Sequence, residues 1–213
     1  MRAPVRVPRG LDALNAEAAR RPLRPQVDSF LFLRHGETDG NRLHFYQGAE
    51  QPLNAAGEAQ AREAAGILAG EPVKRIVASD MRRAWQTATI VAAAVGATPV
   101  PSTGLRERWF GDFVGTSTAD FDWSRHPPNG EDLGDFVARA RGALAAALAG
   151  SGRTLVVAHG GVLYVALAAL GIPFEATLAT NALPLRFVAE AGVWRASPLR
   201  TLNVSGVGVG SLS

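Results

Sequence analysis

The amino-acid sequence predicts an α/β fold: a three-layer sandwich with a mostly parallel central sheet, helices on both faces and a small cap segment. Three observations lead to this prediction. Short apolar runs typical of strands alternate with longer stretches of helical periodicity, which indicates parallel strands joined by helices. No internal repeat or linker interrupts residues 28–203, so one domain is the simplest division. With 213 residues, of which 47% are hydrophobic and 19% charged, the chain can bury one substantial core.

The strands and helices are expected to alternate along the chain. Strand-like runs occupy residues 29–33, 75–79, 98–101 and 154–158, followed by an antiparallel edge at 185–189 and 194–198. Helical stretches occupy residues 54–68, 81–95, 131–149 and 162–170. The apolar side chains that share one face of the helix over 131–149 are Leu133, Phe136, Val137, Ala140, Leu144 and Leu148.

The helix over 81–95 carries both a start and a stop signal. Ser79 or Asp80 is expected to cap its first turn, because short polar side chains accept hydrogen bonds from the free N–H groups there. Gly96 is expected to end the helix, because glycine readily adopts the left-handed conformation that is common at helix ends.

Residues 1–27 are predicted to form a basic N-terminal arm. Its six arginines outnumber its two acidic residues by four, whereas the whole chain has a net charge of only +3. The body is therefore close to neutral, which argues against nucleic-acid binding. We expect the arm to be loose, although residues 11–20 also fit a short surface helix, and it has no apolar stretch typical of a secretory signal. The main folded domain is expected over residues 28–203, followed by a flexible Gly/Ser-rich tail over 204–213.

The composition excludes several functions. The longest nearly unbroken apolar run, residues 161–173, has 13 residues, whereas a membrane-spanning helix needs roughly 20, so no membrane partner is expected. The chain has no cysteine, which excludes a disulfide scaffold, a cysteine zinc site and a thiol nucleophile. A chain without cysteine fits a reducing compartment, and a cytoplasmic localisation is expected.

Polar clusters follow three of the predicted strands. They are RHGET at residues 34–38, SDMRR at 79–83 and HGG at 159–161. In a parallel sheet the carboxyl ends of the strands meet at one edge, which is where ligands bind. Two histidines and two arginines are therefore expected to converge at this edge. Glu107 lies in the irregular segment between the later clusters.

Fixed arginine charges around a neutral imidazole suit a phosphoryl group better than a metal ion. His35 is the candidate nucleophile, provided that an acceptor such as a backbone carbonyl holds the proton of its other ring nitrogen. Arg34, Arg83 and His159 are candidates for holding the phosphoryl oxygens, and a poor leaving group needs a proton donor, for which Glu107 is the candidate. From the residues alone, purely structural histidines and a surface ion pair of Glu107 with its arginine neighbours remain open alternatives.

Four motifs, in order, resemble those of the histidine phosphatase superfamily, the phosphoglycerate mutase-like group. They are LRHGET at residues 33–38, SDMRRAWQTA at 79–88, LRE at 105–107 with FGDF at 110–113, and VAHGGV at 157–162. Asn41, Gln47-Gly48, Pro52-Leu53 and Gly130-Glu131 also fit the family's pattern. The resemblance covers about residues 29–203, which is nearly the whole body of the chain.

The resemblance implies that His35 is the residue that becomes phosphorylated and that Glu107 is the proton donor. It selects Arg83 rather than Arg82 for the phosphate pocket. The rest of that pocket would be formed by Arg34 and His159, and further substrate contacts would come from Asn41, Gln47, Gly48 and Gly160. The resemblance implies no metal and no cofactor, and its expected partner is a small phosphorylated substrate.

The predicted function is a metal-independent phosphomonoester hydrolase that acts through a phosphohistidine intermediate on a small phosphorylated metabolite. Only 23 residues separate Glu107 from Glu131, where the family's mutases carry a long insertion, and a small cap favours a phosphatase. The alternatives are phosphoglycerate mutase-type transfer and a non-catalytic module that binds phosphate esters. A metal hydrolase that uses His35, His159 and Glu107 is a further alternative, although Arg34 would repel its cation.

Five of the 15 aromatic residues lie within positions 109–123, in the predicted cap: Trp109, Phe110, Phe113, Phe121 and Trp123. These rings could stack on a ring of the substrate, or they could pack the cap against the body. Trp123 is the residue on which we expect the two interpretations to differ.

Overall fold

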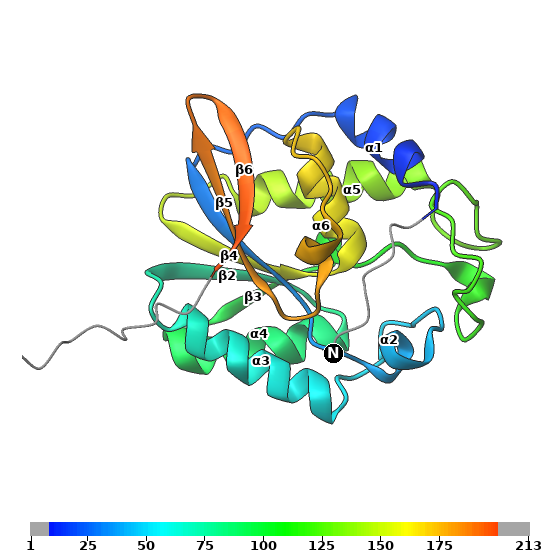
Figure 1. Ribbon diagram of the computed structural model, residues 1–213, viewed down its shortest axis with the longest axis horizontal. Coiled ribbons are helices and arrows are strands. Elements are labelled where there is room, and N and C mark those ends of the chain that lie inside the picture. The colour runs from blue at the N-terminus through cyan, green and yellow to red at the C-terminus, as the bar shows by residue number, and fades with distance from the viewer. Residues whose placement is uncertain (1–8, 200–213) are drawn as a thin grey trace, which may run out of the picture.

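A computed structural model describes residues 9–199 of the chain. Its centre is a six-stranded sheet with the strand order β3-β2-β4-β1-β5-β6 (Figure 1). Parallel pairing joins β1 (Ser29–Arg34), β2 (Val73–Ser79), β3 (Pro99–Ser102) and β4 (Arg153–Ala158). Antiparallel pairing adds β5 (Pro184–Glu190) and β6 (Val193–Pro198) at the edge beside β1. The predicted α/β fold with a mostly parallel sheet and an antiparallel edge is confirmed.

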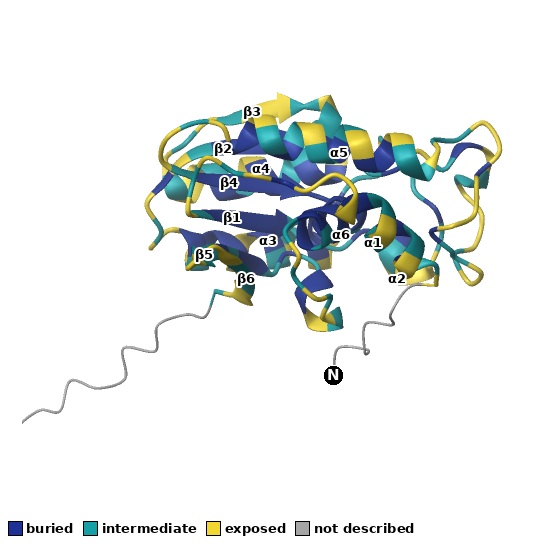
Figure 2. Ribbon diagram, turned by 90° about the horizontal axis from the view of Figure 1, so that it is seen from above, coloured by how far each residue is buried: buried dark blue, intermediate teal, exposed yellow. Residues whose placement is uncertain are grey.

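Two layers of helices enclose the sheet (Figures 1 and 2). One face is covered by α3 (Ala55–Leu68) and α4 (Arg82–Val95), and the other by α1 (Leu11–Ala19), α5 (Leu133–Ala147) and α6 (Gly160–Ala169). The short elements are α2 (Asp39–Leu43), η1 (Thr103–Leu105), η2 (Gly111–Phe113) and η3 (Ala176–Ala179). Among the described residues, no helix combines the length and the apolar character needed to cross a membrane.

Strand β1 shows why this sequence needs helices on both faces. Its side chains alternate, so that Phe30 and Phe32 pack into the core on the α1, α5 and α6 side. Leu31 and Leu33 pack into the core on the α3 and α4 side. All four are fully buried, which is typical of a parallel strand enclosed between two helical layers.

The sequence prediction is correct for the C-terminal end of α4 and wrong for its N-terminal cap. Gly96 ends the helix with φ 70°, as predicted. The predicted cap by Ser79 or Asp80 is wrong, because Met81 is the N-cap residue and no side chain caps the first turn. Asp80 instead forms an ion pair with Arg106, and the Ser79 hydroxyl lies beside His159. Contacts between distant segments therefore override the local capping signal.

The predicted loose arm is wrong for residues 9–27. Leu11, Leu14 and Leu23 are buried in the same core as α5 and α6. The backbone N–H of Leu23 also donates to the carbonyl of Ala169, at 2.9 Å. The prediction followed the arginine count, whereas the spacing of the apolar residues decides how the segment packs. Residues 1–8 of the arm and the predicted tail over 204–213 lie outside the described residues.

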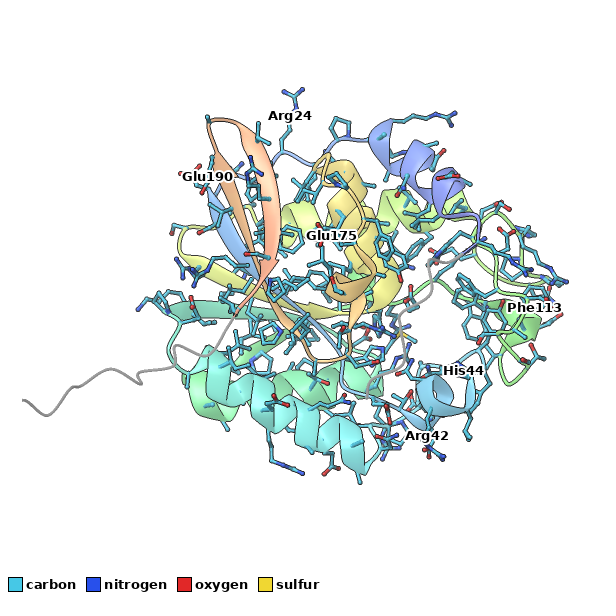
Figure 3. All side chains as sticks on the ribbon, viewed as in Figure 1. Arg24, Arg42, His44, Phe113, Glu175 and Glu190 are labelled. Atoms are coloured by element: carbon cyan, nitrogen blue, oxygen red, sulfur yellow. The ribbon has the colours of Figure 1, made fainter. Side chains whose placement is uncertain are left out.

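The cap is formed by residues 106–132, and its aromatic side chains pack it against the body. The loop that contains His44 and the segment that contains Phe113 lie at the same end of the molecule (Figure 3), and the Thr118 N–H donates to the His44 carbonyl at 2.8 Å. Trp123 is only 2% exposed and stacks on Phe136 of α5, with 5.8 Å between ring centroids. Trp123 therefore packs the cap against α5, as the packing interpretation expects.

Candidate active site

The carboxyl ends of β1, β2 and β4 meet at one edge of the sheet. Arg34 at the end of β1 pairs with Ala158 of β4, so the residues that follow them, His35 and His159, leave the sheet side by side. Their ring centroids are 5.2 Å apart. Parallel pairing thus joins two histidines that lie far apart in the sequence, as the strand pattern predicts.

The ring of His35 is held in one tautomer. Its Nδ1 lies 2.7 Å from the carbonyl oxygen of Gly36, and its Nε2 lies 3.2 Å from the guanidinium Nε of Arg83. A carbonyl only accepts a hydrogen bond and a guanidinium only donates one, so Nδ1 carries the proton and Nε2 presents its lone pair. Burial first, then the charges of Arg83 and Arg34, hold the pKa of His35 well below its ordinary value. This arrangement is that of a neutral imidazole whose Nε2 is unprotonated and accepts a hydrogen bond from Arg83.

Two arginines supply the positive charge. Arg83 is 2% exposed, and besides His35 it donates to the carbonyl of Gly48 at 3.0 Å. Burial lowers the pKa of Arg83 to about 10, against the charge of Glu107, which raises it, so the guanidinium stays cationic at neutral pH. Arg34 donates to the carbonyl of Ala179, and its buried Nε has no hydrogen-bond partner among the described residues.

Three other positions near these side chains differ in whether and how they contact the site. Arg82 is exposed, so of the two consecutive arginines only Arg83 reaches His35. Gly160 lies against Arg34, and a Cβ at Gly160 would be 3.7 Å from the Nε of that arginine. Gly48 takes part through its backbone carbonyl, because that oxygen accepts the hydrogen bond from Arg83.

Glu107 is anchored at the start of α6. Its carboxylate accepts hydrogen bonds from the backbone N–H of Gly161, at 2.9 Å, and from that of Arg108, at 3.0 Å. A Cβ at Gly161 would lie 2.1 Å from the Oε1 of Glu107, so this close approach requires glycine. Arg106 pairs with Asp80 instead, and the alternative of an ion pair between Glu107 and its neighbours is not what the structure shows.

A partly buried ion pair holds the segment that carries Glu107. Arg139 of α5 bonds Glu131 through two hydrogen bonds of 2.7 Å each. The same guanidinium donates to the carbonyls of Gly104 and Arg106, at 2.9 and 3.0 Å. The cap end of the site is thereby tied to α5.

The side-chain amide oxygens of Asn41 and Gln47 both accept hydrogen bonds from other groups of the protein. The Oδ1 of Asn41 accepts from the backbone N–H of Thr38, at 3.2 Å, and from Asn181, at 3.3 Å. The Oε1 of Gln47 accepts from the hydroxyl of Thr38, at 2.7 Å. With the oxygens engaged, the amide N–H groups remain available as donors. Gly40 makes room for Gln47, because a Cβ at Gly40 would be 2.2 Å from the Gln47 Cγ.

Three residues that sequence reasoning did not assign complete the site. The hydroxyl of Thr87 accepts from the Gly36 N–H, at 3.1 Å, and donates to the Arg83 carbonyl, at 2.8 Å. Asn181 donates to the carbonyl of His35, at 3.0 Å. Ser79 lies 2.8 Å from the Nε2 of His159. Ser79 and Thr87 lie within the second motif, over residues 79–88, so their position in the sequence could have marked them as site residues. Asn181 is a single asparagine before β5, and no motif around it indicates a role in the site.

The donor set does not suit a metal ion. No group of three or more His, Asp or Glu side chains with metal-binding geometry occurs within the described part of the chain. The lone pair of His35 already faces Arg83, and Nε2 of His159 faces Ser79. A cation between these histidines would be repelled by Arg83 and Arg34, so the metal-hydrolase alternative does not fit.

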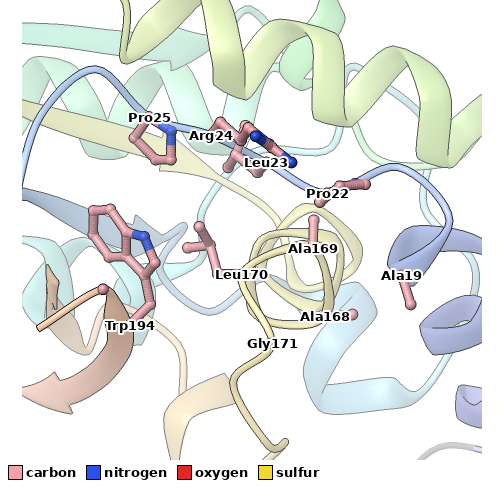
Figure 4. A pocket seen from close by; sticks show the side chains of 11 residues that line it. Ala19, Pro22, Leu23, Arg24, Pro25, Ala168, Ala169, Leu170, Gly171 and Trp194 are labelled. Carbon is pink, nitrogen blue, oxygen red and sulfur yellow. The ribbon is translucent and has the colours of Figure 1, made fainter.

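A separate cavity of about 600 Å³ lies away from this edge of the sheet (Figure 4). It lies between the segment after α1, the end of α6 and the turn between β5 and β6, and Arg24 and Trp194 are among its lining residues. Its lining, within the described part of the chain, includes neither histidine of the candidate active site, nor Arg34, Arg83 or Glu107.

Comparison with known proteins gives the same family as the motifs. Glucosyl-3-phosphoglycerate phosphatase of Mycobacterium tuberculosis is 32% identical over 166 residues, which cover 66% of this chain and 74% of that protein. A solved structure of the mycobacterial enzyme of that name, in complex with VO3, is 27% identical with a TM-score of 0.67, covering 80% of this chain and 98% of that one. Agropine synthesis reductase of Rhizobium rhizogenes is 33% identical over 79% of this chain, but this chain spans only 41% of its length.

A sequence model of one protein family matches most of the chain. The model described as histidine phosphatase superfamily (branch 1) matches residues 30–186, which include RHGET at 34–38 and HGG at 159–161. A relative named probable phosphoglycerate mutase, from Yersinia enterocolitica, is 33% identical over 66% of this chain and 74% of that protein. The chain belongs to the histidine phosphatase superfamily (branch 1), a family of phosphomonoesterase and phosphoglycerate mutase-like enzymes.

Proposed function

We propose that the protein is a metal-independent phosphomonoester hydrolase that acts through phospho-His35 on a small phosphorylated metabolite. One observation carries the proposal: the His35 ring is neutral, its proton is held on Nδ1 by Gly36, and its Nε2 lone pair lies next to Arg83. A nucleophile that is already deprotonated and oriented, with a cation beside it, is what attack on an anionic phosphate ester requires.

In the first step, Nε2 of His35 attacks phosphorus and the bond to the ester oxygen breaks. Arg34, Arg83 and His159 hold the phosphoryl oxygens, and each charge-assisted hydrogen bond contributes about 1.5–3 kcal/mol. Protonated Glu107 gives its proton to the departing oxygen, which leaves as an alcohol. These bonds cannot supply the whole acceleration, so positioning and the covalent intermediate contribute the remainder.

In the second step, water attacks the phosphohistidine and gives a proton to the Glu107 carboxylate. The phosphorus–nitrogen bond breaks, its electron pair returns to Nε2 of His35, and inorganic phosphate is released. Glu107 is then protonated again, so the cycle closes without a metal or a cofactor. The anchoring of both carboxylate oxygens by backbone N–H groups supports a fixed position for this acid.

The amide N–H groups of Asn41 and Gln47 support a polar substrate, because they can donate to phosphoryl or hydroxyl oxygens. The named activity of the mycobacterial relative, on glucosyl-3-phosphoglycerate, is an example of such a substrate class. Mutase-type transfer is the second candidate, and the relative named probable phosphoglycerate mutase favours it. The short segment of 23 residues between Glu107 and Glu131, within the cap, supports the hydrolase instead.

The test is phosphate release from an aryl phosphate by wild type and His35→Ala, each in excess chelator. The matched control is His126→Ala, because His126 is a largely exposed cap histidine paired with Asp132. We expect wild type and His126→Ala to turn over with chelator present, and His35→Ala to be inactive. Loss of wild-type activity in chelator, or retained activity in His35→Ala, would reject the proposal. An isomeric phosphate ester in place of free phosphate would identify a mutase.

A further inference from the structure

His159 has an unusual set of neighbours for a buried histidine. It is fully buried, and its Nε2 lies 2.8 Å from the hydroxyl oxygen of Ser79. Its Nδ1 is also buried but has no hydrogen-bond partner among the described residues. A buried polar atom without a partner is costly unless a ligand completes it, so Nδ1 is the atom of His159 that a bound phosphoryl group would meet.

A neutral imidazole carries its proton on one nitrogen only, and the two possibilities have opposite effects on an anion. With the proton on Nδ1, His159 donates a hydrogen bond to a phosphoryl oxygen. With the proton on Nε2, it presents a lone pair to the same oxygen and repels it. Burial first, then the charge of Arg83, hold the pKa of His159 well below its ordinary value. The neutral ring, with one proton on one of its two nitrogens, is therefore the favoured form.

The hydrogen bonds around Ser79 decide between the two tautomers. Its hydroxyl oxygen accepts from the backbone N–H of Met81, at 3.3 Å. The acceptor within reach of the hydroxyl proton, among the described contacts, is Nε2 of His159. If Ser79 donates to Nε2, the proton of the imidazole is on Nδ1, and the group left for a ligand to complete is this Nδ1–H donor. In the opposite tautomer both the Ser79 hydroxyl proton and the Nδ1 lone pair would be without partners, and an anionic ligand would complete neither; a buried polar group without a partner costs about 1–3 kcal/mol.

We propose that Ser79 is a positioning residue that sets the tautomer of His159, so that Nδ1–H donates a hydrogen bond to the substrate's phosphoryl group. The inference rests on the proposed function for the identity of the ligand. It adds a role for Ser79 that acts entirely through His159, and it explains why this serine faces β4 and does not cap α4.

The first test reads the tautomer directly. Long-range ¹H–¹⁵N correlation spectra, recorded at mildly alkaline pH on protein labelled at histidine, distinguish protonated from unprotonated ring nitrogens. We expect Nδ1–H for His159 in wild type and in Ser79→Thr, and a shift toward Nε2–H in Ser79→Ala. Ser102→Ala is the matched control, because Ser102 pairs with Ser79 in the register of β2 and β3. A wild-type His159 protonated on Nε2 would overturn the inference.

The second test measures binding of inorganic phosphate and of vanadate. Ser79→Ala should weaken both by roughly 10- to 100-fold, which corresponds to one charge-assisted hydrogen bond. Ser79→Thr should restore binding, and Ser102→Ala should bind as wild type does. Unfolding midpoints of all variants establish that the folded state is intact. Unchanged phosphate binding in a folded Ser79→Ala protein would also reject the proposal.

A double-mutant cycle separates action through His159 from a general structural role. In His159→Asn, an amide nitrogen stands near the position of Nδ1 and donates without help from Ser79. Ser79→Ala should therefore weaken phosphate binding in the wild-type background and have little further effect in the His159→Asn background. Equal losses in both backgrounds would contradict the inference. None of these measurements uses turnover, so a failure of His35-dependent hydrolysis is recognised separately.

Discussion

The guanidinium Nε of Arg83 lies 3.2 Å from Nε2 of His35 and donates a hydrogen bond to the lone pair that would attack phosphorus. In the absence of substrate, the Arg83 guanidinium therefore lies where the phosphorus atom would have to approach Nε2 of His35. A phosphoryl group that enters the site must replace this contact with hydrogen bonds to its own oxygens. In the proposed mechanism, Arg83 thus orients His35 in the free protein and becomes available to the substrate when that contact is exchanged.

Arg83→Ala should lower kcat/KM by at least roughly 10- to 100-fold, because it removes a charge-assisted hydrogen bond and a buried cation. The matched control is Arg82→Ala, one residue earlier on α4 but exposed, which should leave kcat/KM almost unchanged. Arg83→Lys should recover only part of the loss, since lysine lacks the planar fork that reaches both His35 and Gly48. Similar kinetics for the two alanine variants would contradict this assignment.

The two buried histidines should make stability depend on pH. Their pKa values are lowered mainly by burial. Below about pH 6.5 these two histidines therefore bind protons in the unfolded chain but stay unprotonated in the folded chain. The free energy of unfolding should therefore be level just above this pH and fall as the pH decreases below it. Each histidine contributes at most about 1.4 kcal/mol per pH unit.

Urea unfolding of wild type, His35→Gln and His159→Gln between mildly acidic and neutral pH checks this prediction. Each variant should have a smaller slope than wild type, and the double variant a smaller slope still. His126→Gln serves as control, because its side chain is largely exposed and should leave the slope unchanged. A wild-type free energy of unfolding that stays constant as the pH falls would be incompatible with two neutral buried histidines.

The sequence predicted the strand-end convergence because parallel pairing has a fixed consequence: RHGET and HGG follow strands that run in the same direction. It did not predict what depends on the register of distant strands. Ser79 has the local signal of a helix cap, but the pairing of Ala78 with Val157 brings it beside His159 instead. Asn181 reaches His35 because β5 pairs with β1, and no local pattern marks that contact.

Gly161→Ala should impair the proposed proton donor. The added Cβ would lie 2.1 Å from Oε1 of Glu107 and 2.6 Å from the ring of Trp123, so the carboxylate must move. Turnover of alkyl phosphates, whose leaving oxygen needs a proton, should fall much more than turnover of an activated aryl phosphate. Gly66→Ala in α3 is the control, because a Cβ there meets nothing within 4 Å. Equal losses for both substrates would indicate that Gly161 does not act through Glu107.

Leu14→Ala tests whether the basic segment before β1 belongs to the folded domain. Leu14 is fully buried between α1 and the helices α5 and α6, and removing a buried leucine side chain costs about 2–5 kcal/mol. Leu43, which is 56% exposed on α2, provides the matched control, and Leu43→Ala should change the free energy of unfolding by less than about 0.5 kcal/mol. Urea unfolding measures both. If Leu14→Ala were as harmless as Leu43→Ala, α1 would contribute nothing to stability and the segment would behave as the loose arm that its arginine count suggests.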